Sequence, residues 1–267
     1  MVCRTCGRLV GVNDARCWEC GARNPSLWGW APAFRRLGED LGFTWLAIGA
    51  CTVLYLLALV LEPSAIGARG FLSFLSPGVQ STFLLGAAGN VPVVGYGRWW
   101  TLLSAGWLHG SLLHIFFNMY WVRMLAPAVA RLYGPGRMVI VYVVASVTGF
   151  LASSLLPGGA RLTLGASAAL MGLLGAMIHY GRRGGSSEVS RWAWGYAILF
   201  IVFGFVVPGI DNWAHLGGFG GGWLAARVLD PLKPERIDHL VVALVLLVAS
   251  LAAIVVSVIT GLPYVRT

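Results

Sequence analysis

From residue 43 onward, long apolar segments alternate with short polar ones. A membrane-spanning helix needs about 20 predominantly apolar residues, whereas a strand of a membrane β-barrel shows about ten residues of alternating polarity. The chain has the first pattern and lacks the second. We therefore predict an all-α polytopic membrane protein. Its seven helices are expected at 43–61, 112–132, 138–156, 163–180, 192–207, 213–228 and 240–260.

Composition supports this class, with 58% hydrophobic and 11% charged residues and a mean hydropathy of +0.77. A soluble domain is nearer half apolar and a quarter charged. The first 42 residues are polar and have no short apolar run near Met1. We therefore expect no cleavable signal peptide.

The positive charges predict the orientation in the membrane. If the N-terminus is cytoplasmic, fourteen Lys and Arg residues fall on the inside and four on the outside. Positive charge favours the cytoplasmic side, so we expect a multi-pass protein of the cell membrane with its N-terminus inside and its C-terminus outside. The net charge of +9 then reflects topology and attraction to anionic lipid. It does not indicate a nucleic-acid partner, because the sequence has no single basic face.

Residues 1–26 are expected to form a separate zinc-ribbon-like module. They contain two Cys-x2-Cys pairs ten residues apart, namely Cys3, Cys6, Cys17 and Cys20. Four thiolates suit a closed tetrahedral site for a structural Zn²⁺ ion. Gly7 and Gly21 follow the pairs and permit the turn that points backbone N–H groups at the sulfurs. Two disulfides are the alternative, which a reducing cytosol disfavours. A cytosolic partner of this module is possible.

Two connecting segments have interfacial character. Residues 27–42 form a juxtamembrane linker, in which aromatic and basic residues suit a membrane anchor, although an ordinary loop fits equally well. Those residues are Trp28, Trp30, Phe34, Arg35 and Arg36. Residues 62–111 are too long and too apolar for a bare linker, so we expect short amphipathic helices in the outer leaflet.

Four polar residues lie inside three of the predicted helices, where polar groups are costly enough to indicate function. They are His114, Asn118, Ser167 and His215. At a rise of about 1.5 Å per residue, each lies about 6 to 12 Å from the outer end of its helix, so all four share one layer. His114 and Asn118 are four residues apart and therefore lie on one helix face.

These residue types suit acyl transfer. A serine hydroxyl needs a base to take its proton, and histidine is the usual base. The oxyanion that forms needs aimed donors, which His114, Asn118 and the Ser167 backbone N–H can supply. No Asp or Glu lies in a helix at this depth, and Asp211 precedes its helix, so the pattern predicts a Ser–His dyad and not a triad. Taken alone, the serine is better explained as a packing residue bonded to its own helix.

Small residues on the fourth and sixth helices predict close contact between them, because they let helix backbones touch. They surround Ser167 at Gly165, Ala166, Ala168, Ala169, Gly172 and Gly175, and His215 at Ala214, Gly217, Gly218, Gly220, Gly221 and Gly222. Such contact would bring Ser167 and His215 within hydrogen-bond reach.

At these residues the sequence resembles the rhomboid family of intramembrane serine proteases. The resemblance covers roughly residues 43–230, with 240–260 as an appended seventh helix. Its motifs are Gly97–Thr101, His109 followed by His114–Met119, Gly165–Ser167 and Ala214–Gly218. It implies that Ser167 is the nucleophile and His215 the general base. It also implies an oxyanion hole lined by His114, Asn118 and the Ser167 amide.

The same resemblance implies hydrolysis of peptide bonds in or beside the transmembrane helices of membrane-protein substrates. Substrates would enter laterally from the lipid bilayer, past the fifth helix. Three positions depart from the family's pattern: Ala168 replaces a frequent Gly, Met171 replaces an aromatic residue, and Ala130 replaces a common Glu. A non-catalytic rhomboid-like binder or escort of membrane proteins is the competing hypothesis. A transporter has less support, because the sequence shows no inverted repeat.

Overall fold

The computed structural model describes residues 3, 5–11, 14–23, 25, 37–67, 70 and 73–265. Some of the features predicted from the sequence lie outside these residues. They are the membrane anchor at Trp28, Trp30, Phe34, Arg35 and Arg36, and the counted charges Arg4, Arg69 and Arg266.

Each of the seven predicted segments contains a helix, and no strand occurs in the described residues. The long helices are α2 (Phe43–Leu61), α5 (Leu112–Tyr133), α6 (Pro135–Leu155), α7 (Ser167–Arg182), α8 (Ser187–Val206), α9 (Asn212–Val228) and α10 (Ile237–Val265). Five of them, α2, α5, α6, α8 and α10, are long and apolar enough to cross a membrane. Helices α7 and α9 are shorter, with 16 and 17 residues. The protein is thus an all-α, multi-pass membrane protein.

Helix α7 begins at Ser167, four residues later than the sequence predicts. The reason is local backbone pairing, because Thr163 forms an antiparallel bridge with Ala88. Gly165 then adopts φ +126°, a value that a right-handed helix excludes and that glycine tolerates. Ser167 is therefore the first residue of α7 and does not lie in the middle of the helix.

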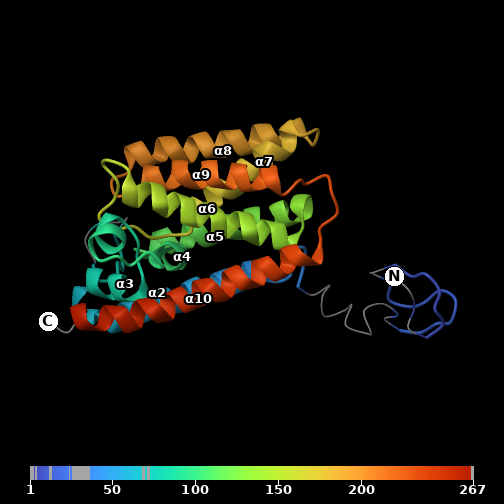
Figure 1. Ribbon diagram of the computed structural model, residues 1–267, viewed down its shortest axis with the longest axis horizontal. Helices are drawn as coiled ribbons and strands as arrows, with labels where there is room; N and C mark the ends of the chain where they lie inside the picture. The colour runs from blue at the N-terminus through green and yellow to red at the C-terminus, as the bar shows by residue number, and fades with distance from the viewer. Residues whose placement is uncertain are drawn as a thin grey trace.

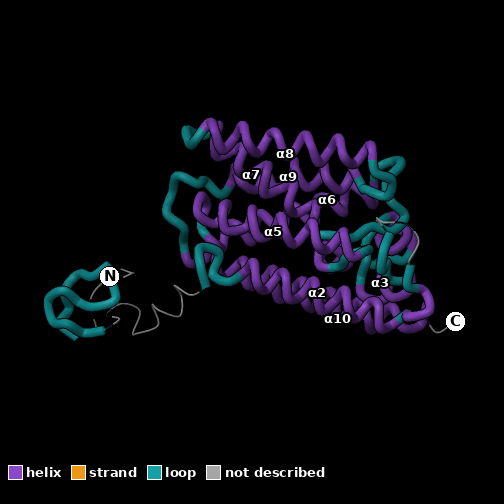
Figure 2. Tube along the Cα trace, turned by 180° about the vertical axis from the view of Figure 1, so that it is seen from behind, coloured by secondary structure: helices purple, strands orange, loops and turns teal. Residues whose placement is uncertain are grey.

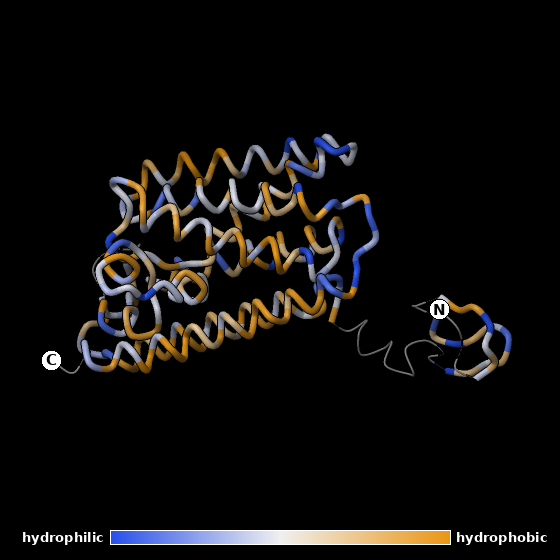
Figure 3. The backbone as a smooth tube through the Cα atoms, in the orientation of Figure 1, coloured by the Kyte–Doolittle hydropathy of each residue, from blue (hydrophilic) through white to orange (hydrophobic). Residues whose placement is uncertain are grey.

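The bundle is layered around α6, α7 and α9, as Figures 1 and 2 show. Helix α9 packs chiefly against α6 and α7, α8 covers α7 on one edge, and α2 and α10 lie toward the other edge. Figure 3 shows hydrophobic residues along the helices and hydrophilic ones at the loops. Glycine contacts confirm the predicted close approach of α7 and α9, because a Cβ on Gly222 would lie 2.3 Å from the Cα of Gly172.

The segment between α2 and α5 covers one end of the bundle, and we call residues 79–111 the cap segment. It contains α3 (Val79–Leu85), η3 (Val91–Gly95), α4 (Thr101–Ser104) and η4 (Ala105–Trp107). Short helices were predicted here, but their apolar residues are more buried than an interfacial location implies. Leu85, Val93 and Ala105, for example, are at most 1% exposed. The cap segment packs on α6 and on the final helix, α10 (Figure 1).

Candidate functional site

The turn that precedes Ser167 lies against the His114 ring. The Gly165 N–H donates to the Ala105 carbonyl at 3.0 Å, which ties the turn to the cap segment. A Cβ on Gly165 would lie 2.6 Å from Nε2 of His114, so the imidazole lies directly against the turn. Ser167 itself is partly exposed, whereas its neighbours Ala166 and Ala168 are fully buried.

The first turn of α5 fixes the orientation of His114. The Ser111 hydroxyl caps the helix by accepting from the His114 backbone N–H at 3.2 Å. The Gly110 N–H donates to Nδ1 of the ring at 3.3 Å. An Nδ1 that accepts a hydrogen bond belongs to the tautomer with its proton on Nε2. His114 therefore presents an N–H donor to the turn before Ser167.

Asn118 lies one turn further along α5 and is buried. Its Nδ2 group donates to the His114 carbonyl at 2.8 Å and keeps a second N–H. Its Oδ1 atom has no hydrogen-bond partner within the described part of the chain. His109 is also buried, and its ring stands edge-on to that of His114, with 5.1 Å between the centroids. The His109 ring thus packs against the His114 ring.

His215 lies in the first turn of α9. Asp211 caps this helix by accepting from the Ala214 N–H at 3.0 Å, and its carboxylate also accepts from the Ser153 hydroxyl. The His215 ring is 7% exposed, and its Nδ1 atom has no partner among the described residues. Asp211 thus caps the helix and binds Ser153, and among the described residues no hydrogen bond joins it to the imidazole.

The contact between α7 and α9 brings Ser167 and His215 to neighbouring turns. A Cβ on Gly218 would lie 2.2 Å from the Ala168 carbonyl oxygen, so the two backbones touch next to both residues. No hydrogen bond joins Ser167 and His215 among the described side chains. Active-site hydrogen bonds are often long in the free state and tighten when substrate binds.

The three departures from the family pattern are all accommodated in the core. Ala168 and Met171 are fully buried, and Ala130 is 4% exposed. Near Ala130, the Tyr133 hydroxyl donates to the Ala176 carbonyl at 2.9 Å and lies 3.2 Å from Nδ1 of His179. This contact joins α5 to α7 near the position where the family has its glutamate.

The four N-terminal cysteines form a cluster with the geometry of a metal site. Their sulfur atoms all lie within 4.8 Å of one another, and Cys3–Cys20 and Cys6–Cys17 are each 3.7 Å apart. A tetrahedral ion with metal–sulfur bonds of about 2.3 Å requires sulfurs about 3.8 Å apart. These distances are far too long for disulfides, and all four thiols are free. The cluster can therefore hold a metal ion.

The two halves of the cysteine cluster repeat one backbone turn. The Gly7 N–H donates to the Cys3 carbonyl at 2.8 Å, and the Gly21 N–H donates to the Cys17 carbonyl at 2.9 Å. Both glycines have positive φ, +71° and +69°, which confirms the role predicted for them. The backbone N–H groups of Cys6 and Thr5 lower the pKa of the Cys3 thiol to about 6, whereas burial raises the pKa of the Cys6 and Cys20 thiols.

Comparison with known proteins identifies relatives of the helical part. Residues 96–232 match the family model of the Rhomboid domain. The chain is 32% identical to Rhomboid protease GluP of Bacillus subtilis over 65% of its own length and 34% of that protein. It is 35% identical to RHOMBOID-like protein 5 of Arabidopsis thaliana over 60% of its own length and 53% of that protein. The chain therefore spans between a third and about half of the length of these relatives.

Proposed function

Because this chain belongs to the rhomboid family, we propose that it is an intramembrane serine endopeptidase. It would hydrolyse peptide bonds in or next to the transmembrane helices of membrane-protein substrates. The observation that carries the proposal is the position of His114, whose Nε2–H faces the turn before Ser167 at the point where α7 and α9 touch. This position supports a site in which the proposed nucleophile, base and oxyanion donors lie at one end of the bundle.

In the proposed mechanism the Ser167 hydroxyl attacks the scissile carbonyl carbon while His215 takes the hydroxyl proton. The resulting oxyanion accepts hydrogen bonds from His114 Nε2, Asn118 Nδ2 and the Ser167 backbone N–H. Ser167 is the first residue of α7, so its N–H has no partner within the helix and lies at the positive end of the helix dipole. This position makes the backbone N–H a suitable oxyanion donor.

Collapse of this intermediate breaks the peptide C–N bond, and the protonated His215 gives its proton to the leaving amine. A water molecule then attacks the acyl-enzyme, His215 takes a proton from that water, and Ser167 recovers its hydrogen as the acid product leaves. No carboxylate takes part, because Asp211 is engaged by Ser153 and the Ala214 N–H. The reaction thus uses a Ser–His dyad.

Substrate would reach Ser167 laterally from the bilayer, past α8. This helix lies at the edge of the bundle, and only two of its residues, Ala193 and Ala197, are buried. We propose that the N-terminus is cytoplasmic and that the active site opens to the outside, as the charge distribution predicts. The transmembrane domain would then comprise residues 43–267, preceded by the linker at 27–42.

The cysteine cluster of residues 1–26 is proposed to hold one structural Zn²⁺ ion. The donor set and the sulfur spacing fit, and zinc prefers four thiolates in closed structural sites. When bound, the ion stabilises the fold of the module, whose described residues form a small apolar cluster of Cys3, Val10 and Cys17. In the proposed topology this module lies in the cytosol, where a soluble partner can dock.

The proposal is tested by labelling and cleavage with the purified full chain in lipid vesicles. We expect a fluorophosphonate probe to label Ser167 and a reporter transmembrane substrate to be cut. Both signals should vanish in Ser167→Ala and His215→Ala, while Ser154→Ala, which removes a buried helix serine elsewhere, should behave as the parent. Cleavage that persists in Ser167→Ala would refute the assignment and favour a non-catalytic binder contaminated by another protease.

A further inference from the structure

The final helix, α10, satisfies two donors of the cap segment through a single residue. Ser257 is fully buried, and its carbonyl accepts from Nη2 of Arg98 at 2.6 Å. Its hydroxyl accepts from Nε1 of Trp100 at 3.1 Å. Arg98 is itself buried, and its Nη1 donates to the Phe83 carbonyl at 2.8 Å. Ser257 therefore supplies one of the two carbonyls that receive this buried charge.

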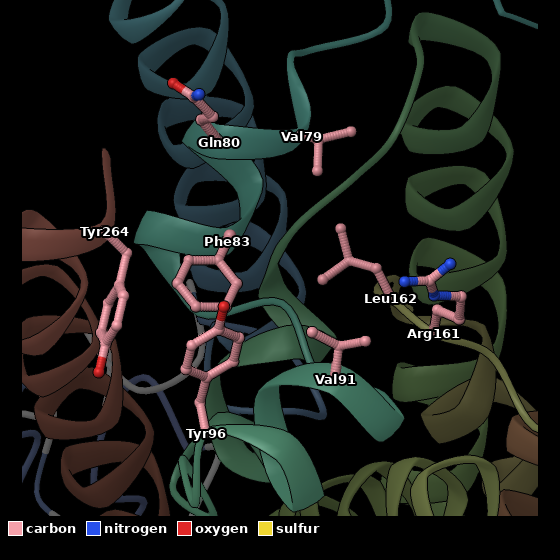
Figure 4. Close-up of a pocket in the computed structure, with 8 residues that line it drawn as sticks. All are labelled: Val79, Gln80, Phe83, Val91, Tyr96, Arg161, Leu162 and Tyr264. Carbon is pink, nitrogen blue, oxygen red and sulfur yellow. The ribbon is translucent and has the colours of Figure 1, made fainter. Parts of the chain in front are cut away.

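Aromatic contacts hold the end of α10 against the same segment. Tyr264 stands edge-on to Tyr96 and Phe83, with ring centroids 4.9 and 6.1 Å apart, and Arg98 lies 4.2 Å above the Phe83 ring. Figure 4 shows these three rings on one side of a pocket of about 340 Å³, with Arg161 of the α6–α7 loop on the other. The helix backbone is close as well, since a Cβ on Gly261 would lie 3.0 Å from Leu84.

The cap segment in turn fixes the loop that leads to Ser167. Ala88 exchanges two backbone hydrogen bonds with Thr163, at 3.0 and 2.8 Å, and Ala105 accepts from the Gly165 N–H. Within the cap segment, the Ser104 hydroxyl donates to the Gly86 carbonyl at 2.7 Å. Direct contacts therefore run from α10 through the cap segment to the turn next to Ser167.

From this arrangement we infer that α10 positions the active site, with Ser257 as its principal positioning residue. The inference rests on the proposed function, since it takes Ser167 as the nucleophile. If Ser257 is altered, the Trp100 N–H loses its buried acceptor and the cap segment shifts to recover one. That shift displaces the Gly165 turn and the Ser167 N–H. Small displacements of catalytic groups reduce rates strongly, even when they originate far from the reacting atoms.

The experiment is a double-mutant cycle with Ser257→Ala and Trp100→Phe, which remove the acceptor and the donor of one hydrogen bond. The full chain in lipid vesicles is measured for the rate of fluorophosphonate labelling, for kcat and KM, and for thermal unfolding. Each single variant should lower kcat and the labelling rate by about 3- to 10-fold with KM unchanged, the effect of one lost hydrogen bond. The double variant should be no worse than either single.

Two further variants make the result specific. Tyr264→Leu keeps an apolar side chain but removes both ring contacts, so it should also lower kcat. Ile259→Ala truncates a side chain of the same helix that is 64% exposed, and it should match the parent. Parent-like kcat in Ser257→Ala, or additive losses in the double variant, would overturn the inference. If instead the parent chain is not labelled at Ser167, the proposed function itself fails and this inference fails with it.

Discussion

Gly165→Ala tests the placement of His114 most directly. The new methyl group would lie 2.6 Å from Nε2 and 2.7 Å from Cε1 of His114, closer than such carbon contacts normally come, and the ring must move. The position also has φ +126°, beyond the left-handed α region, where an alanine is strained by about 1–3 kcal/mol. A ring that moves can no longer donate from Nε2 to the oxyanion. Loss of one such donor typically lowers kcat by about 100- to 1000-fold.

The assay compares kcat, KM and thermal unfolding of Gly165→Ala with those of Gly158→Ala. Gly158 lies in the same loop and also has positive φ, +75°, but a Cβ there would meet no atom within 4 Å. The control therefore places an alanine at a positive φ without the contact with His114. We expect Gly165→Ala to lose more stability than Gly158→Ala, and only Gly165→Ala to lose kcat. Equal kcat in the two variants would show that the Nε2 donor has no part in the reaction.

Two further predictions concern helix packing and the metal site. Gly222→Ala should lower the unfolding temperature by several degrees, because its Cβ would meet the Gly172 backbone at 2.3 Å. Gly220→Ala is the control, because a Cβ at that position meets no atom within 4 Å, and it should leave the unfolding temperature unchanged. Thermal unfolding in detergent distinguishes the two variants. Elemental analysis of the parent should find about one zinc per chain, lost in the Cys3→Ser, Cys6→Ser double variant. A parent without zinc would contradict the assignment of the ion.

The helices were predictable because their signal is strong and local. Apolar runs of about 16 to 21 residues predicted all seven segments, and small residues predicted the contact between α7 and α9. The start of α7 was not predictable from periodicity, because the apolar pattern continues through 163–166. Tertiary pairing of Thr163 with Ala88 decides that boundary. The glycine at 165, two residues before the serine, was the available signal for a turn.

The site residues were predictable as types at a common depth, but their orientation was not. The acceptor role of Nδ1 in His114 depends on the Gly110 N–H. A backbone donor of this kind cannot be recognised from the residue types in the sequence. Ser153, which engages Asp211, lies on α6, 58 residues away from it. The role of Ser257 was equally unpredictable from the sequence, since a serine in an apolar helix usually has a packing role. Such contacts arise only when distant segments meet.

Helix α10 is attached at both of its ends, so the view of it as an appendage to a core of residues 43–230 needs refinement. Near its start, buried Arg137 donates to the carbonyls of Lys233 and Pro234, both at 2.7 Å. Near its end, buried Arg98 donates to the Ser257 carbonyl. A chain that stopped at residue 230 would leave two buried guanidinium groups without these acceptors. A hydrogen bond to a charged group contributes about 1.5–3 kcal/mol, a sizeable part of the stability of a whole domain. The energetic unit that holds Ser167 therefore includes α10.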